Sequence, residues 1–193
     1  MPDSQDGRPD GGVPRRGPGR PGPRKKGGGP PRGGGRGPRP SRGAAGRGPI
    51  RLAAIGGENF ELVHPRCVAE SELDYEEGLE IWKAGDPEGA RDALRYALAA
   101  CRDNLWIHTA LGKLAVEEFR DPSLAQGHFG YAVELAERAI PPQFGGRLPP
   151  ERAANRPFYE ALDGLIGTLE ALGKSADAAR LRGWRERLGR PGK

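Results

Sequence analysis

The sequence predicts an all-α domain made of helical hairpins, preceded by a long segment without helices or strands. Over residues 71–104, apolar residues recur at spacings of three and four, which is typical of amphipathic helices. The tripeptide Gly85-Asp86-Pro87 divides this stretch and carries the chemistry of a tight turn between two helices. Residues 1–50, in contrast, hold 16 Gly and 11 Pro and no aromatic residue. The chain therefore divides into a tail and one helical domain.

Residues 1–50 form a basic tail that we expect to be disordered. Val13 and Ile50 are their only large aliphatic residues, so the segment cannot bury enough apolar surface to offset the loss of chain entropy. The tail carries ten Arg and two Lys against three Asp, a net charge of +9. The remaining 19 basic and 23 acidic residues leave residues 51–193 at −4, within a total of +5. The basic character of the protein therefore comes from the tail.

A flexible basic chain binds nucleic acid by neutralising phosphates and releasing counterions. Arg32-Gly33-Gly34 and Arg36-Gly37 resemble the RGG segments of RNA-binding proteins, although the aromatic residues that stack on bases in such segments are missing. The tail is thus expected to bind RNA weakly and without sequence preference, or to act only as a solubilising segment. The residues assigned to nucleic-acid contact are Arg15, Arg16, Arg24, Lys25, Lys26, Arg32, Arg36 and Arg39.

Residues 51–69 are expected to form an extended lead-in to the helical domain. Pro65 disfavours a long helix before it. Phe60 and Val63 belong to a short apolar run, and we expect both side chains to cover the exposed end of the helices.

The first hairpin is predicted at 71–104, within a helical domain spanning 70–189. Its first helix shares one apolar face among Leu73, Gly78, Ile81 and Trp82. Its second helix does the same with a set of mostly small residues: Ala90, Ala93, Leu94, Ala97, Leu98 and Cys101. Small residues are placed where two helices must approach closely.

Gly78, Ala90 and Ala97 are separated by twelve and seven residues, and the stretch from Ser71 to Asn104 is 34 residues long. This pattern resembles the tetratricopeptide repeat (TPR), a helix-turn-helix of 34 residues. Asp74 replaces the bulky aromatic residue usual early in the first helix, with Tyr75 beside it. The resemblance implies a right-handed α-solenoid of about three hairpins.

The second hairpin is predicted at 105–140, where Asp121-Pro122 repeats the turn chemistry. Its residues Gly112, Ala125, Phe129 and Ala132 match the repeat pattern if one extra residue is allowed at the turn. Gly127 and Gly130 each cost about 1 kcal/mol relative to alanine inside a helix. We interpret both glycines as points of close helix contact, with a local bend as the alternative.

A proline-rich crossing at 141–157 then leads to a third hairpin at 156–189 and a short C-terminal tail at 190–193. Two Pro-Pro pairs favour an ordered, extended crossing, which Phe144 and Leu148 are expected to attach to the helices. Asn155 is expected to cap the helix that follows. The sequence Asn155-Arg156-Pro157-Phe158 resembles the entry to the final repeat in a sub-type of bacterial repeat proteins.

The TPR resemblance implies that the first helix of each hairpin lines a concave, peptide-binding surface. The groove residues expected on this basis are Tyr75, Leu79, Trp82, Lys83, Trp106, Thr109 and Lys113. Packing between repeats is an equally good explanation for Trp82 and Trp106.

The sequence offers no catalytic constellation. Gly173-Lys174-Ser175 lacks the earlier glycine and the strand of a P-loop, because Thr168 stands at the glycine position. His64, Cys67, Cys101, His108 and His128 do not have the spacing of a zinc site. We expect no catalytic residues, no metal and no cofactor.

Two features predict the cellular setting. No apolar run matches a secretion signal or a membrane span, and two cysteines are too few for a disulfide framework. We expect a soluble, cytoplasmic protein with reduced thiols, in which Cys101 is a buried hydrophobic residue.

The expected function is that of a non-enzymatic TPR-type adaptor that binds a peptide segment of a partner protein. The alternative is an RNA- or ribosome-associated protein that works through its tail. Neither hypothesis involves a membrane or a small-molecule substrate.

Overall fold

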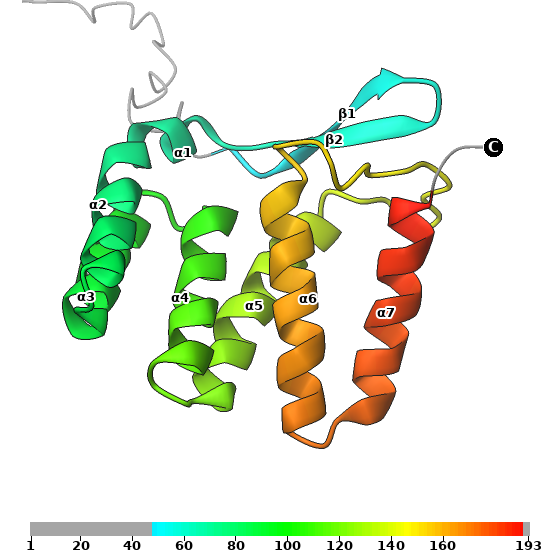
Figure 1. Ribbon diagram of the computed structural model, residues 1–193. Coiled ribbons are helices and arrows are strands. Elements are labelled where there is room, and N and C mark those ends of the chain that lie inside the picture. The colour runs from blue at the N-terminus through cyan, green and yellow to red at the C-terminus, as the bar shows by residue number, and fades with distance from the viewer. Residues whose placement is uncertain (1–47, 191–193) are drawn as a thin grey trace, which may run out of the picture. The chain divides into compact units, whose positions relative to one another are not determined.

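The computed structural model describes residues 48–190, which form seven helices and a two-stranded sheet (Figure 1). The elements are β1 (Arg51–Gly56), β2 (Asn59–Val63), α1 (Arg66–Glu70), α2 (Glu72–Lys83), α3 (Pro87–Ala100), α4 (Leu105–Glu117), α5 (Pro122–Glu137), α6 (Arg156–Ala171) and α7 (Ser175–Gly189). The prediction of a mainly helical domain is confirmed. The predicted disorder of residues 1–47 and the short tail at 191–193 lie outside the described residues.

The turns within the three hairpins follow the chemistry of their residues. Gly85 adopts a φ of 84°, and the Asp86 carboxylate accepts a hydrogen bond from the Gly89 N–H at 2.9 Å. The Asp121 carboxylate caps α5 in the same way through the Leu124 N–H, also at 2.9 Å. Gly173, at a φ of 73°, ends α6 as expected. These local signals place α2–α3, α4–α5 and α6–α7 as pairs of packed helices.

Gly112, Gly164 and Gly78 mark the places where helices approach most closely. A Cβ on Gly112 of α4 would lie 2.6 Å from the Phe129 ring, and one on Gly164 of α6 would lie 2.5 Å from the same ring. Phe129 of α5 is 2% exposed, so its ring fills the space that both glycines leave. A Cβ on Gly78 would come within 2.8 Å of Leu94, which joins α2 to α3.

The interpretation of Gly127 and Gly130 as points of close contact is wrong. A Cβ on either residue would meet nothing within 4 Å. Both residues belong to α5, yet they face open space while Phe129 on the same helix makes the contacts. Helix packing therefore does not account for these two glycines.

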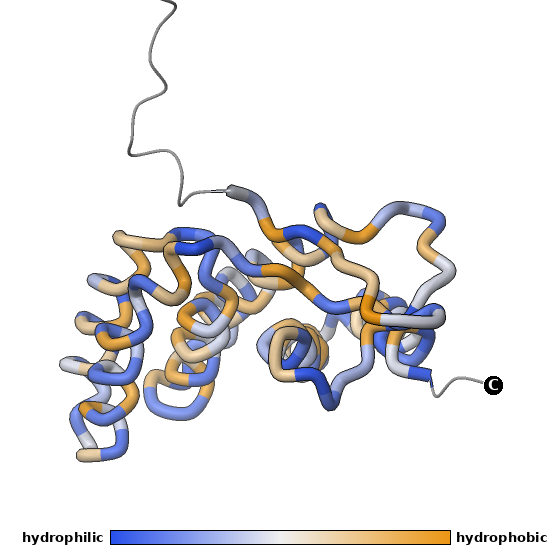
Figure 2. The backbone as a smooth tube through the Cα atoms, turned by 90° about the horizontal axis from the view of Figure 1, so that it is seen from above, coloured by the Kyte–Doolittle hydropathy of each residue, from blue (hydrophilic) through white to orange (hydrophobic). Residues whose placement is uncertain are grey.

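The buried apolar residues form a large cluster over α4–α7 and the β-hairpin of β1 and β2, and a smaller one between α2, α3 and α4. Along each helix, hydrophobic and hydrophilic residues alternate as the amphipathic pattern requires (Figure 2). Leu73, expected on the inner face of α2, is 79% exposed, so that expectation is wrong. The buried contact of α2 is made by Gly78, with Tyr75 and Leu79 half-buried beside the smaller cluster.

The expected extended lead-in is instead a β-hairpin followed by the short helix α1. β1 and β2 pair antiparallel, with Arg51 opposite Val63 and Ala54 opposite Phe60. In Figure 1 the hairpin lies across the upper ends of the helices. Leu62, at 1% exposed, is its buried anchor, whereas Phe60 and Val63 are half-buried. The role of the segment as a cover was thus predicted, but its structure and its main anchor were not.

Asn155 joins the hairpin to the crossing, and the expected cap of α6 is absent. Its side-chain oxygen accepts from the Leu62 N–H at 2.9 Å. Its amide nitrogen donates to the carbonyls of Phe60 at 3.2 Å and Pro149 at 3.0 Å. The residue stands at the N-cap position of α6, but its side chain makes no capping bond. A fully buried amide is therefore used to connect three segments.

The predicted crossing 141–157 packs on the rest of the domain through Phe144 and Leu148, as expected, but it is not extended throughout, because it contains turns at 150–155 and its last two residues belong to α6. The Phe144 ring packs edge-on against Phe60, with centroids 5.0 Å apart. Leu148 is completely buried, and its N–H donates to the Leu188 carbonyl at 2.9 Å. The hydroxyl of Tyr159 donates to the Leu148 carbonyl at 2.5 Å, and burial raises the pKa of Tyr159 to about 12.

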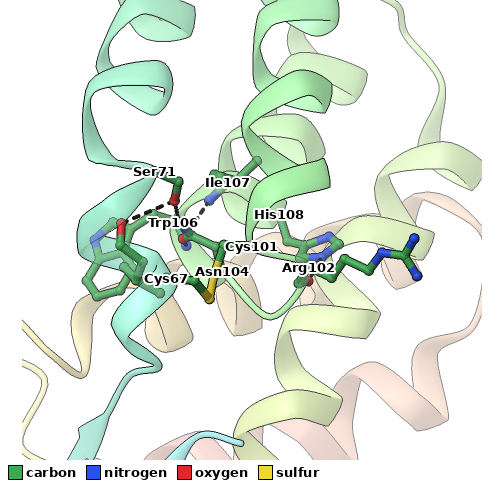
Figure 3. Close-up of a disulfide and its surroundings, with 9 residues drawn as sticks. Cys67, Ser71, Cys101, Arg102, Asn104, Trp106, Ile107 and His108 are labelled. Atoms are coloured by element: carbon green, nitrogen blue, oxygen red, sulfur yellow. Dashed lines mark hydrogen bonds between the residues drawn. A yellow bond between two sulfur atoms is a disulfide. The ribbon is translucent and has the colours of Figure 1, made fainter. Parts of the chain in front are cut away.

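Cys67 and Cys101 form a disulfide, so the expectation of reduced thiols is wrong (Figure 3). The bond connects α1 to the end of α3, with Cα atoms 5.3 Å apart. Beside it, the Asn104 amide donates to the Ser71 hydroxyl at 3.1 Å, while its oxygen caps α4 through Trp106 and Ile107. This pairing could not be predicted from the sequence, because the cysteines are 34 residues apart and meet only when α1 folds back onto α3.

Substitution of Gly112 by alanine is expected to destabilise the domain by about 1–3 kcal/mol, because the added methyl group overpacks the contact with Phe129. Chemical denaturation measures this change. Gly130→Ala is the matched control: it adds the same methyl group to open space and should stabilise the helix by up to about 1 kcal/mol. A Gly112→Ala variant as stable as wild type would contradict the packing role.

Substitution of Cys67 by serine is expected to lower the free energy of unfolding by about 3–4 kcal/mol, the loop-closure value for a 34-residue separation. Urea denaturation with and without reductant measures the effect. Reductant should destabilise the wild type and leave the variant unchanged. Identical wild-type midpoints under both conditions would show that the disulfide does not form.

Candidate binding surfaces

The first candidate surface is the face of α2, α4 and α6 on which the groove was expected. Tyr75 of α2 and Trp106 of α4 line a hollow of about 290 Å³. Glu72 and Glu76 line the same hollow. The Trp106 ring packs against His64 at a centroid distance of 4.2 Å. The hollow therefore combines two aromatic side chains with two carboxylates.

A second hollow of about 440 Å³ lies further along the same face, between α4 and α6. Lys113, Val116 and Phe129 belong to its lining. Lys113 forms an ion pair with Glu160 of α6 at 2.6 Å, with each side chain about 40% exposed. Trp106, Lys113 and Val116 are separated by seven and three residues, so they share one stripe of α4. This stripe contributes to both hollows.

The remaining predicted groove residues have other positions. Trp82 donates from its indole N–H to the Glu118 carboxylate at 2.8 Å, which connects α2 to the end of α4. Lys83 pairs with Glu80 on its own helix. Leu79 is half-buried and packs on the smaller core cluster. None of these three residues lines either hollow.

Thr109 was wrongly placed in the groove. It is 3% exposed, and its hydroxyl lies 2.7 Å from the Leu105 carbonyl and 3.1 Å from the Pro157 carbonyl. Its single proton is thus shared between two backbone acceptors, one of which belongs to the start of α6. The residue fastens α4 to α6 and has no free polar group for a ligand.

A larger cleft of about 630 Å³, which the sequence did not indicate as a site, lies between α3, α4 and α5. One wall carries Arg95, Leu98 and Ala99 of α3 and Arg102 of the turn that follows it, and the α5 wall carries Ser123, Leu124, Gly127, His128 and Tyr131. His108 of α4 completes the lining. The volume lies within the range of pockets that hold small organic ligands. No sequence signal marks the cleft, because Gly127 and Gly130 are both unfavourable in a helix and free of packing contacts, yet only Gly127 lines it.

His108 and His128 form a hydrogen-bonded pair in this cleft, with their Nδ1 atoms 3.3 Å apart. His108 Nε2 lies 2.9 Å from the Arg102 carbonyl and must carry the proton to bond with it. His108 Nδ1 is then the acceptor, and His128 Nδ1 the donor. Burial lowers the pKa of His108, while burial together with the nearby His108 and Arg95 lowers the pKa of His128 to about 4. Both imidazoles are therefore neutral at pH 7.

No group of three or more His, Cys, Asp or Glu within residues 48–190 is arranged to hold a metal ion. The two cysteines among the five residues weighed for zinc are bonded to each other. No helix in the same range is long and apolar enough to cross a membrane. The eight tail residues assigned to nucleic-acid contact precede the described part of the chain, so the structure does not place them.

Comparison of the chain with protein-family models, with curated proteins and with solved structures gives no match. The resemblance to the TPR family therefore stays a prediction. What can be inferred about function comes from the geometry of the surfaces described above.

The stability of the protein is expected to fall as the pH drops from about 6.5 towards 4. Burial lowers the pKa values of His64, His108 and His128 in the folded state, whereas the same groups titrate near 6.5 when unfolded. The unfolded chain thus binds more protons in this window, and stability is fully present only above it. Urea midpoints between pH 7.5 and 5 measure the loss. His128→Gln should show a shallower pH dependence, and an unchanged slope would contradict the assignment to His128.

Proposed function

We propose that this protein is a non-enzymatic interaction module in which the face of α2, α4 and α6 binds a peptide segment of a partner protein. In this proposal the three hairpins stack as a short right-handed solenoid of the TPR type. Support comes from the 34-residue period, from the small residues Gly78 and Gly112 packed under Leu94 and Phe129, and from the hairpin that covers the helix ends.

The observation that carries the proposal is the pair of hollows along one stripe of α4. Trp106 lines one hollow and Val116 the other, ten residues apart in the helix, which corresponds to about 15 Å. An extended peptide spans this distance in about four to five residues. The surface therefore suits a peptide with two anchor side chains at that spacing.

The chemistry of the two hollows differs, which indicates the type of anchor that each accepts. Glu72 and Glu76, beside Tyr75 and Trp106, suit a lysine or arginine held between carboxylates and aromatic rings. The second hollow has apolar lining from Val116 and Phe129 and suits an aliphatic side chain. We propose a partner segment with a basic residue and an aliphatic residue four to five positions apart.

The proposal predicts the properties of peptides selected on the full chain from a random displayed library. They should carry the basic and aliphatic pair, and their affinity should fall at least tenfold on both Glu76→Lys and Val116→Glu. Fluorescence anisotropy with the synthesised peptides measures the change. Tyr96→Ala is the matched control, because Tyr96 is an aromatic residue 72% exposed on α3 and lies outside both hollows. Selected peptides that bind both face variants like wild type would rule out this surface.

The second candidate function is RNA binding by the tail, which the charge of +9 on residues 1–50 against −4 on the rest favours. Binding of single-stranded RNA to the full chain should weaken steeply with salt, because it depends on counterion release. Deletion of residues 1–47 should abolish it in filter-binding measurements. Equal affinity of the full and shortened chains would exclude the tail as the binding segment.

A further inference from the structure

The cleft between α3 and α5 is separate from the peptide-binding face and has the features of a ligand site. Arg95 and Leu98 lie three residues apart on α3, and Arg102 follows in the turn after that helix. On α5, Leu124, Gly127 and Tyr131 are spaced by three and four residues, so they share one face of the helix. These two sets of residues form opposite walls, with His108 of α4 also in the lining. The walls are mainly apolar, and the charged groups are confined to one of them.

The two arginines of the cleft form no ion pair with a carboxylate of the described part of the chain. Within residues 48–190, neither Arg95 nor Arg102 has a carboxylate within 4.0 Å, whereas seven other arginine or lysine side chains of this range are paired, among them Arg91, Arg138 and Arg185. Asp103 lies near His108 and forms no ion pair with Arg95 or Arg102 among the described contacts. In Figure 3 the Arg102 side chain extends away from the disulfide, although its own backbone carbonyl is held by His108.

The histidine pair contributes no charge at pH 7, because both rings are neutral and hydrogen-bonded to each other. The charged side chains in the lining of the cleft at pH 7 are therefore those of Arg95 and Arg102. Gly127 keeps the α5 wall open, because any side chain there would project into the space that its hydrogen atom now leaves free.

We propose that this cleft binds a free organic acid: a single carboxylate on an apolar, chain-like or aromatic body. Arg95 and Arg102 attract and pair with the carboxylate. Leu98, Leu124 and Tyr131 cover the hydrocarbon. The arginines repel a cation, and a neutral molecule with the same hydrocarbon part makes only the apolar contacts. A volume of about 630 Å³ accommodates a medium-length chain without movement of the helices.

The test uses decanoate as the probe, titrated into the full chain at pH 7.5 below its micelle-forming concentration and followed by isothermal calorimetry and amide chemical shifts. Decanol and decylammonium have the same ten-carbon chain as decanoate, but decanol is neutral and decylammonium is a cation. Decanoate should bind at least tenfold more tightly than decanol, and decylammonium should not bind. The shifted amides should belong to α3 and α5. Equal affinity for decanoate and decanol, or no decanoate binding at millimolar concentration, would overturn the proposal.

Two sets of variants locate the site. Arg95→Gln and Arg102→Gln alter exposed charges without affecting packing, and each should weaken decanoate binding about fivefold to tenfold, because a charge-assisted hydrogen bond is lost. Gly127→Leu fills the cleft and should abolish binding, while Gly130→Leu, on the same helix but outside the lining, should retain it. Unchanged affinity in both arginine variants would overturn the proposal even if Gly127→Leu fails to fold.

A last comparison separates a free acid from the end of a protein chain, which carries the same chemistry. An acetylated peptide ending in a leucine carboxylate should bind more weakly than decanoate, since its backbone amides would have to leave water for an apolar wall. Tighter binding of the peptide would overturn the assignment to a free acid. The Val116→Glu variant should bind decanoate like wild type, which keeps this test independent of the peptide-binding face.

Discussion

The arrangement of the helices depends on one contact, the insertion of the Phe129 ring between Gly112 and Gly164. The ring comes from α5, and the two glycines come from α4 and α6, so a single side chain fixes the distances among three helices. Either glycine with a side chain would force the ring out of a space in which it is almost fully buried. Because α4 then lies directly against α6, Thr109 meets the Pro157 carbonyl and Lys113 meets Glu160. The stripe of α4 that contributes to both hollows follows from this placement.

Polar groups hold the other end of the domain. Asn155 satisfies three backbone groups, from the hairpin and the crossing, with one buried amide, and Tyr159 satisfies a fourth at Leu148. A buried backbone group without a partner costs about as much as a lost hydrogen bond, so these side chains allow irregular segments to pack over the helices. The hairpin and the crossing thereby become one cover for the helix ends. The disulfide has a similar role at α1, which is too short to be stable without an attachment to α3.

The two surfaces differ in chemistry because they lie on different sets of helices. On the face of α2, α4 and α6, the first hollow is lined by two carboxylates and two aromatic rings, and Lys113 of the second hollow is already paired with Glu160. The cleft between α3 and α5 contains arginines without such partners and a neutral histidine pair. In the two proposals, the first surface takes a basic peptide and the cleft takes an anion. These chemistries give the two proposed activities separate ligands and separate tests.

The sequence by itself determined what depends on neighbours in the chain. The turns at Gly85-Asp86-Pro87 and Asp121-Pro122, the helices that they join, and the small residues at Gly78 and Gly112 follow from spacing and capping, which act over a few residues. Only the tertiary structure decided the β-hairpin, the three hydrogen bonds of the Asn155 side chain and the disulfide. It also decided that Thr109 is buried and that Leu73 is exposed. Each of these involves partners in another element, up to 95 residues away in the case of Asn155 and Phe60. The cleft between α3 and α5 was hidden for the same reason. From the sequence alone, a helical glycine that faces a neighbouring helix, as Gly112 does, cannot be distinguished from one that faces open space, as Gly127 does.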